Sequence, residues 1–256
     1  MFKNLVLISF ISLPLASENL LDIYNEALDN DPQYKSSEYS LLAGKEFVVQ
    51  GRAGLLPNVT LSGSTNWNEY YQFDELQSAY NNNSVTARLT QPLFRLDSWF
   101  NFKRSKKLTD ASEADFAYAQ QNLIIRTVEK YFGVLRAIDN LNAAVSEEKA
   151  IKKQLDQIQQ RFEVGLSAIT EVQEAQLAYD LSVAAKIRSE GALFNAREEL
   201  NSLIGREIFS IDSLKADIVP ENPNPTTKQE WVDIALKNNY RLQASVLRRD
   251  ASQDSA

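Results

Sequence analysis

Carboxylates are the main residues of this sequence that could carry out acid–base chemistry. The 256 residues include 34 Asp and Glu but no His and no Cys. They therefore offer no thiolate or imidazole metal site, no cysteine nucleophile, no His-based serine triad and no disulfide. Acid pairs such as Glu147–Glu148 and Glu198–Glu199 lie on helix-like stretches without a metal-ligand pattern or glycine-rich loop. We interpret them as surface charge, and predict no catalytic residue, no metal, no cofactor and no enzyme activity.

The charge balance argues against a nucleic-acid partner. Lys and Arg number 27, which leaves a net charge of -7, whereas a phosphate-binding groove needs positive surface. One basic cluster, Lys103, Arg104, Lys106 and Lys107, follows a predicted strand. It would meet anionic head groups if that strand enters a membrane, and otherwise it forms a solvated helix face.

The N-terminus has the pattern of a secretory signal. Lys3 precedes an apolar run from Leu5 to Leu15 that is too short to span a bilayer as a helix. We expect cleavage after Ser17, and the alternative is a buried N-terminal strand. The segment that follows has helical periodicity, with a break at Asp31–Pro32.

Between residues 58 and 92 the hydrophobic period changes to two, which predicts two strands. Residues 59, 61, 63, 65 and 67 share the less polar face of the first strand, and Val85, Ala87 and Leu89 share that of the second. A polar stretch from Asp74 to Asn83 predicts a loop between them. Such strands are typical of outer-membrane barrels, although a soluble hairpin on a core gives the same alternation.

Aromatic residues flank these strands. Trp67, Tyr70 and Tyr71 lie at one end, and Trp99 and Phe100 at the other. Aromatic girdles of this kind mark the two interfaces of a membrane-embedded barrel. We therefore predict these five residues as a membrane aromatic girdle.

Two long helices follow. Residues 97–162 contain no proline and would extend for roughly 100 Å as a helix. Their apolar residues repeat at spacings of three and four, which predicts a coiled-coil seam with one shift of phase: Tyr131, Val134, Ile138, Leu141, Val145, then Ile151, Leu155, Ile158 and Phe162. A looser rhythm follows after a turn at Gly165: Ile169, Val172, Tyr179, Val183 and Ile187.

Four motifs resemble the TolC-like outer-membrane efflux and secretion channels. They are Glu18–Leu20, Leu56–Pro57, Leu89–Phe94 and, most specifically, Arg161–Thr170. The similarity covers nearly the whole chain. It implies a mainly α fold, in which a long antiparallel coiled-coil helical hairpin accompanies two strands contributed to an oligomeric transmembrane β-barrel.

The resemblance also implies a function and partners. It points to a passive export duct in a tripartite efflux pump or type I secretion system, set in the outer membrane and extending into the periplasm. The expected partners are two further copies in a homotrimer, a periplasmic adaptor, an inner-membrane transporter and outer-membrane lipid. A periplasmic coiled-coil adaptor is the alternative, but no β-rich segment follows Ile204 to match the strands before the hairpin.

Within this framework the chain divides into six segments. These are a signal peptide (1–17), an N-terminal helical segment (18–57), an outer-membrane β-hairpin (58–92), a periplasmic hairpin (97–204) with its tip at 164–167, an irregular equatorial segment (205–230) and the start of a second repeat (231–256). The repeat rests on Ala235–Asn239, which echoes Ala27–Asp31. Since only one repeat is complete, we expect a truncated chain, and a non-functional fragment is a further alternative.

The family resemblance assigns two sites on the hairpin. The tip, Val164, Gly165, Leu166 and Ser167, would dock the adaptor, and Thr170 and Glu171 would belong to a gate that closes the tunnel entrance. The structural alternatives are that Gly165 only permits the chain to reverse and that Glu171 only complements the helix dipole.

Overall fold

The computed structural model describes residues 17–214 and 222–254, so the predicted signal peptide lies outside the described residues apart from Ser17. The chain forms two compact units, unit 1 (Met1–Ser36, Ala119–Thr226) and unit 2 (Ser37–Tyr118, Thr227–Ala256). Among the described residues, no helix is both long enough and apolar enough to cross a membrane.

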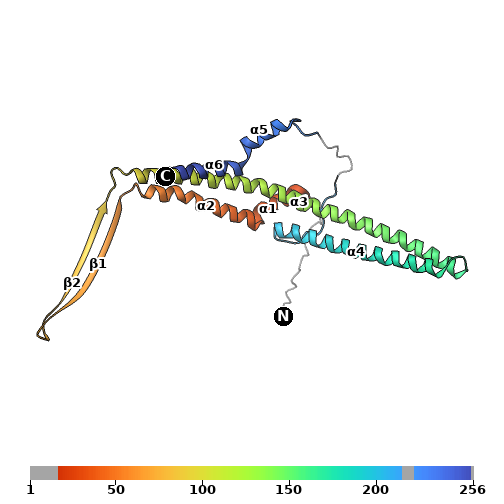
Figure 1. The fold of residues 1–256 in the computed structure, drawn as a ribbon, viewed down its shortest axis with the longest axis horizontal. Coiled ribbons are helices and arrows are strands. Elements are labelled where there is room, and N and C mark those ends of the chain that lie inside the picture. The colour runs from red at the N-terminus through yellow and green to blue at the C-terminus, as the bar shows by residue number, and fades with distance from the viewer. Residues whose placement is uncertain (1–16, 215–221, 255–256) are drawn as a thin grey trace, which may run out of the picture. The chain divides into compact units, whose positions relative to one another are not determined.

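Unit 2 contains an antiparallel β-hairpin, β1 (Asn58–Gln72) and β2 (Glu75–Thr90), which leaves the helices as a two-stranded ribbon (Figure 1). The prediction of a loop over residues 74–83 is wrong, because β2 already begins at Glu75. Phe73 and Asp74 both have positive φ, 51° and 66°, the combination that a two-residue hairpin turn requires. The three asparagines at 81–83 lie within β2, and one of them is bonded across the hairpin: the Thr65 hydroxyl donates to Asn81 Oδ1 over 2.9 Å.

The pairing register agrees with the predicted strand faces. Val59 lies opposite Leu89, and Leu61 lies opposite Ala87. Directly opposed residues of an antiparallel pair share a face, so the apolar residues of both strands line one side. The other side pairs Ser62 with Thr86 and Thr60 with Arg88.

The β-hairpin is connected to a close-packed helix pair, because α2 precedes β1 and α3 follows β2. In unit 2, α2 (Pro32–Ala53) packs against the beginning of α3 (Leu96–Glu163). Gly44 and Gly51 face Ser112 and Ser105, with a spacing of seven residues on both helices, and an added β-carbon at either glycine would overlap the facing serine. The Thr109 hydroxyl donates to the Gly44 carbonyl over 2.9 Å. These small residues therefore allow the two backbones to approach closely.

In unit 1, the rest of α3 forms an antiparallel pair with α4 (Ile169–Ile204), and α1 (Leu20–Asn30) packs against them (Figure 1). Ile23 and Ala27 of α1 are fully buried in a core with Leu123, Leu200 and Leu203.

The predicted seam is only partly buried. Tyr131, Val134 and Leu155 are inside, as a seam requires, whereas Val145, Phe162, Ile169 and Ile187 are exposed. A two-helix pair covers only one stripe of each helix, and these four residues lie outside that stripe.

Two pairs of short helices have matching boundaries. α5 (Lys228–Asn238) and α6 (Tyr240–Gln253) follow each other as α1 and α2 do. Asn19 and Thr227 each cap the first helix of a pair, by accepting from Asp22 N and Glu230 N. The junction residues Asp31 and Asn239 each accept from a backbone N–H three residues on. These correspondences add to the sequence similarity between Ala235–Asn239 and Ala27–Asp31, from which a repeat was predicted.

Candidate functional site

The turn between α3 and α4 has a defined hydrogen-bonded geometry. Gly165 has φ 73°. Its N–H donates to the Phe162 carbonyl over 2.9 Å, and the Leu166 N–H donates to the Arg161 carbonyl over 2.8 Å. This pair of bonds is a Schellman motif, in which glycine takes the left-handed position at no steric cost.

The motif displays two large apolar side chains. Val164 and Leu166 are each 69% exposed, although both belong to residue types that are usually buried. Ser167 is partly buried beside them. The tip is thus a small apolar surface on a rigid turn.

The predicted gate residues lie in the first turn of α4. Thr170 and Glu171 are both exposed. The Ser167 hydroxyl donates to the Glu171 carboxylate, so the structure joins one tip residue to one gate residue. Ala168, at the N-cap, makes no side-chain capping bond, and the negative charge of Glu171 complements the positive end of the helix.

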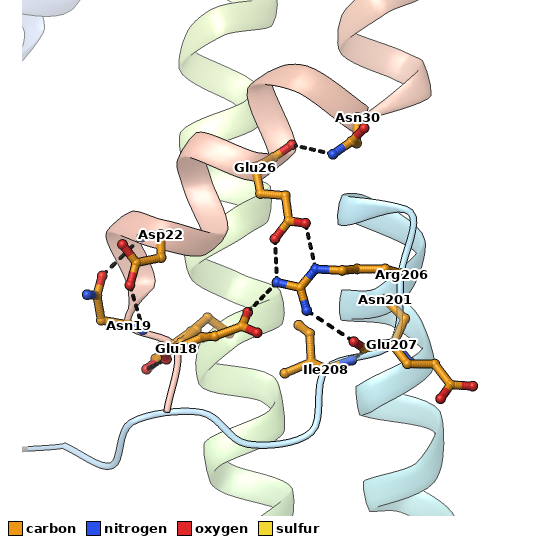
Figure 2. Close-up of polar contacts among 10 residues, drawn as sticks. Glu18, Asn19, Asp22, Glu26, Asn30, Asn201, Arg206, Glu207 and Ile208 are labelled. Atoms are coloured by element: carbon orange, nitrogen blue, oxygen red, sulfur yellow. Dashed lines mark hydrogen bonds and ion pairs between the residues drawn. The ribbon is translucent and has the colours of Figure 1, made fainter. Parts of the chain in front are cut away.

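An arginine at the opposite end of α4 fastens this helix to α1 (Figure 2). α4 ends at Gly205, which has φ 77°, and Arg206 follows. Its Nε lies 2.6 Å from Glu26 Oε1 and its Nη2 lies 2.7 Å from Glu26 Oε2, which is bidentate pairing. Nη2 is also 2.9 Å from Glu18 Oε2. Hydrogen bonding to Glu26, reinforced by Glu18, raises the pKa of Arg206, so this charge is fixed.

The backbone around Glu18 completes this fastening. Glu18 pairs with Ile211 in a parallel bridge, through Glu18 N to Ser210 O (3.2 Å) and Asp212 N to Glu18 O (3.0 Å). The buried Tyr131 hydroxyl of α3 donates to the Asp212 carbonyl over 2.9 Å. Burial is the main reason that the pKa of Tyr131 is raised. We call Glu18, Glu26, Tyr131 and Arg206 the clamp.

A second ion pair holds the junction between α1 and α2. Arg126 of α3 donates to both oxygens of Asp31, over 3.2 Å and 2.5 Å, and the Asp31 side chain is only 4% exposed. Burial alone would raise the pKa of Asp31. Hydrogen bonds from Arg126 and from the Tyr34 and Gln33 backbones outweigh burial and leave the pKa below its usual value.

The clamp and the Asp31–Arg126 pair were not among the predicted sites. Glu26 and Arg206 are 180 residues apart, so no local spacing joins them. The available local signals were the glycine that ends α4 just before Arg206 and the Asn19 cap ahead of α1.

The structure places the aromatic residues on different faces. Trp67 Nε1 and the Tyr71 hydroxyl both donate to the Glu69 carboxylate, over 3.0 and 2.7 Å, so these residues share the face of Val59 and Leu61. Tyr70 lies on the opposite face of β1. Trp99 and Phe100 are exposed at the start of α3.

No metal centre accompanies these features in the described part of the chain, where His, Cys, Asp and Glu nowhere gather in threes to hold an ion. The candidate site is a set of surfaces, namely the two-faced hairpin and the apolar tip, together with the ion pairs that join α1, α3 and α4.

Comparison with known proteins agrees with this architecture. Residues 23–206 match the family described as outer membrane efflux protein. The chain belongs to this family. The matched range begins in α1, includes the hairpin and the tip, and ends at Arg206, so it leaves out Glu18 and the residues at 210–212 that pair with it.

Two relatives show which proteins this chain is similar to. The chain is 33% identical to outer membrane protein TolC of Vibrio cholerae over 245 residues, which are 96% of this chain and 55% of that protein. It is 29% identical to the alkaline protease secretion protein AprF of Pseudomonas aeruginosa, over 87% of this chain and 48% of that protein. The chain thus spans about half the length of the relatives that it matches.

Solved structures share the fold. The Campylobacter jejuni CmeC outer membrane channel superimposes with a TM-score of 0.77 at 19% identity, over 94% of this chain and 52% of that one. The open state of the Neisseria gonorrhoeae MtrE outer membrane channel gives a TM-score of 0.62 over 92% of this chain. The predicted fold class is therefore confirmed.

Proposed function

We propose that this protein forms part of a passive export duct in the outer membrane, in which the β-hairpin joins a trimeric barrel and the α3–α4 tip docks a periplasmic adaptor. An inner-membrane transporter supplies the driving force, and the chain itself catalyses no reaction. The observation that carries this proposal is the combination, in one chain, of a hairpin without a core and a helical pair that ends in an exposed apolar tip.

The dimensions of the hairpin support membrane insertion. From Val59 to Tyr71 the strand extends for about 40 Å at 3.3 Å per residue, or about 28 Å along the membrane normal at a tilt of 45°. The apolar band of outer-membrane barrels is about 25 Å tall. Val59, Leu61, Val85 and Leu89 are all exposed in the single chain, and lipid would cover them. Trp67 and Tyr71 would mark one interface, and Trp99 and Phe100 the other.

The opposite face of the hairpin would line the lumen. Thr60, Ser62, Ser64, Thr86 and Thr90 are small and polar, and Arg88 is the one charge among them. A wall of hydroxyl side chains is wettable, and in a trimer the three copies of Arg88 would add one ring of positive charge. We infer that the partners, more than the barrel, select the cargo.

Val164 and Leu166 support docking at the tip. Apolar groups exposed on a rigid turn in water are a liability unless a partner covers them. Thr170 and Glu171, one turn away, would act as the gate of the tunnel entrance. The hydrogen bond between Ser167 and Glu171 would couple the gate residue to the docking surface.

A substitution at the turn tests this proposal. Gly165→Leu should abolish export while trimers still form in the outer membrane, because leucine strains the left-handed backbone that presents the tip and adds bulk to the docking surface. Gly191→Leu is the control for adding the same side chain elsewhere on α4, where a β-carbon likewise meets nothing within 4 Å but the backbone is helical. Export is measured both as ethidium efflux and as protein released into the medium. Normal export by the Gly165→Leu variant would remove the docking role.

A further inference from the structure

The beginning of α3 concentrates positive charge in an otherwise acidic chain. Residues 95–107 contain five cations and a single anion, Asp97, whereas the whole chain has a net charge of -7. Asp97 is paired with Arg95. Lys107 is held by Asp254 at 2.7 Å and by the Asp250 carbonyl at 3.1 Å. Lys103, Arg104 and Lys106 are exposed.

These cations are directed toward the β-hairpin. Side chains on a helix incline toward its N-terminus, which for α3 is the end that follows β2. Lys103 Nζ lies 5.8 Å from the ring centre of Phe100, and Lys106 Nζ lies 5.2 Å from that of Phe102. Both ammonium groups therefore reach back by about one turn, toward the residues where the strands end.

Lys103, Arg104 and Lys106 are exposed although α2 packs against this part of α3 and Lys107 beside them contacts the end of α6. Ser105 packs against Gly51 of α2, and at 100° per residue Lys103 points roughly 160° away from it. Trp99, Lys103 and Lys106 follow each other at spacings of four and three, so they share one face. Interleaved aromatic and basic side chains at a strand end are the pattern of a membrane-interface anchor.

We propose that Lys103, Arg104 and Lys106 bind the phosphates of anionic phospholipids in the membrane leaflet nearest the helices, with Trp99 and Phe100 seated among the acyl chains. This inference rests on the proposed insertion of the β-hairpin, because only insertion brings the start of α3 to a bilayer surface. The bound lipid would fix how deeply the hairpin enters the membrane and would give the duct a preference for anionic lipid.

The test is lipid selectivity of the purified full chain. Native mass spectrometry would count phosphatidylglycerol and phosphatidylethanolamine retained from mixed micelles. We expect the wild type to prefer phosphatidylglycerol. The triple variant Lys103→Gln, Arg104→Gln, Lys106→Gln should lose roughly 150-fold of that preference, given about 1 kcal/mol per basic residue at a membrane surface.

A matched variant controls for total charge. Lys149→Gln, Lys153→Gln, Arg188→Gln removes three exposed cations from the helical hairpin and should keep the preference. Equal loss in both triple variants would overturn the proposal. If the first variant fails to fold, the wild type still provides a test, because a preference made by exposed charges falls at high salt, and one that salt leaves unchanged would contradict the proposal.

Insertion is measured separately, by protection of the β-hairpin from protease in liposomes. A hairpin that inserts without any preference for phosphatidylglycerol overturns only the lipid site. A hairpin that never inserts overturns the proposed membrane function and the lipid site with it.

Discussion

At the scale of single residues, Asp31 shows how a buried charge is retained. Asp31 is the residue that follows the last turn of α1. Its carboxylate accepts a hydrogen bond from the Tyr34 N–H over 2.8 Å and pairs with Arg126 of α3. In the sequence, Asp31–Pro32 predicts only a helix break. Its ion-pair partner lies 95 residues away, so nothing local in the sequence indicated it.

Asp31→Asn removes the negative charge that pairs with Arg126 but keeps an oxygen that can accept the Tyr34 N–H. Asparagine still accepts a backbone N–H, as Asn239 does at the start of α6, but it leaves Arg126 without its anion. We expect the free energy of unfolding to fall by about 2 kcal/mol at neutral pH, less than for a fully buried pair because Arg126 is partly exposed. Denaturant unfolding measures this, and Asp29→Asn, at an exposed site on α1, should change nothing.

The same variant predicts a pH dependence. Because the folded state lowers the pKa of Asp31, its contribution is complete above the unfolded carboxyl pKa of about 3.9 and is lost as the pH falls through the lower folded value. The stability difference between wild type and Asp31→Asn should therefore be constant down to about pH 5 and shrink below about pH 4. A difference that stays undiminished in acid would contradict the role of the charge.

At the scale of elements, the alternation of the strands predicted their faces but not their length. Residues 74–83 are rich in turn-forming types, and β2 nevertheless includes most of them, because Asn81 and Asn83 pair with Trp67 and Thr65. Cross-strand pairing outweighed local preference there. The helix boundaries near residues 97, 162 and 204 were predictable because long proline-free stretches have few other structures available.

The assignment of the two hairpin faces predicts that an arginine will be costly on one face and tolerated on the other. Leu61→Arg would put a charge on the lipid face and should destabilise the inserted state by about 2–4 kcal/mol. Ser62→Arg, on the neighbouring lumenal position, should be nearly neutral. Folding into lipid vesicles, followed by gel mobility, measures both. Equal effects at the two positions would mean that the faces are assigned wrongly.

The close approach of α2 and α3, where Gly51 faces Ser105, leads to a separate prediction. Gly51→Ala would bring a β-carbon into the Ser105 side chain and within 3.3 Å of the Phe102 backbone. We expect a loss of about 1–3 kcal/mol, as for other overpacked sites, measured by thermal unfolding. Gly191→Ala, where the β-carbon meets open space, should be neutral or slightly stabilising. A stable Gly51→Ala variant would show that the helices do not approach this closely.

At the scale of the whole molecule, the chain has one complete set of elements and two helices that match the beginning of that set. α1 and α5 share their length and the position of their caps, and α2 and α6 follow them in the same way. We propose that α5 begins a second repeat.

The fold class and the tip could be predicted from the sequence, because helical periodicity, strand alternation and the Arg161–Thr170 motif are local features. The clamp could not, since Glu18, Glu26, Tyr131 and Arg206 meet only after α1, α3 and the end of α4 have packed together. Such contacts depend on tertiary arrangement rather than on any spacing along the chain.

Docking of an adaptor at the α3–α4 tip can be tested by one cross-linking experiment. The chain contains no cysteine, so Leu166→Cys introduces a single reactive site on an exposed side chain, and Glu174→Cys provides an exposed control further along α4. After treatment of living cells with a short thiol-to-amine cross-linker, we expect Cys at 166 to join the helical hairpin of a periplasmic adaptor, identified by peptide sequencing, with little product from the control. A tip cysteine that reacts fully with a soluble maleimide and joins no adaptor would show that the tip is accessible but docks no adaptor.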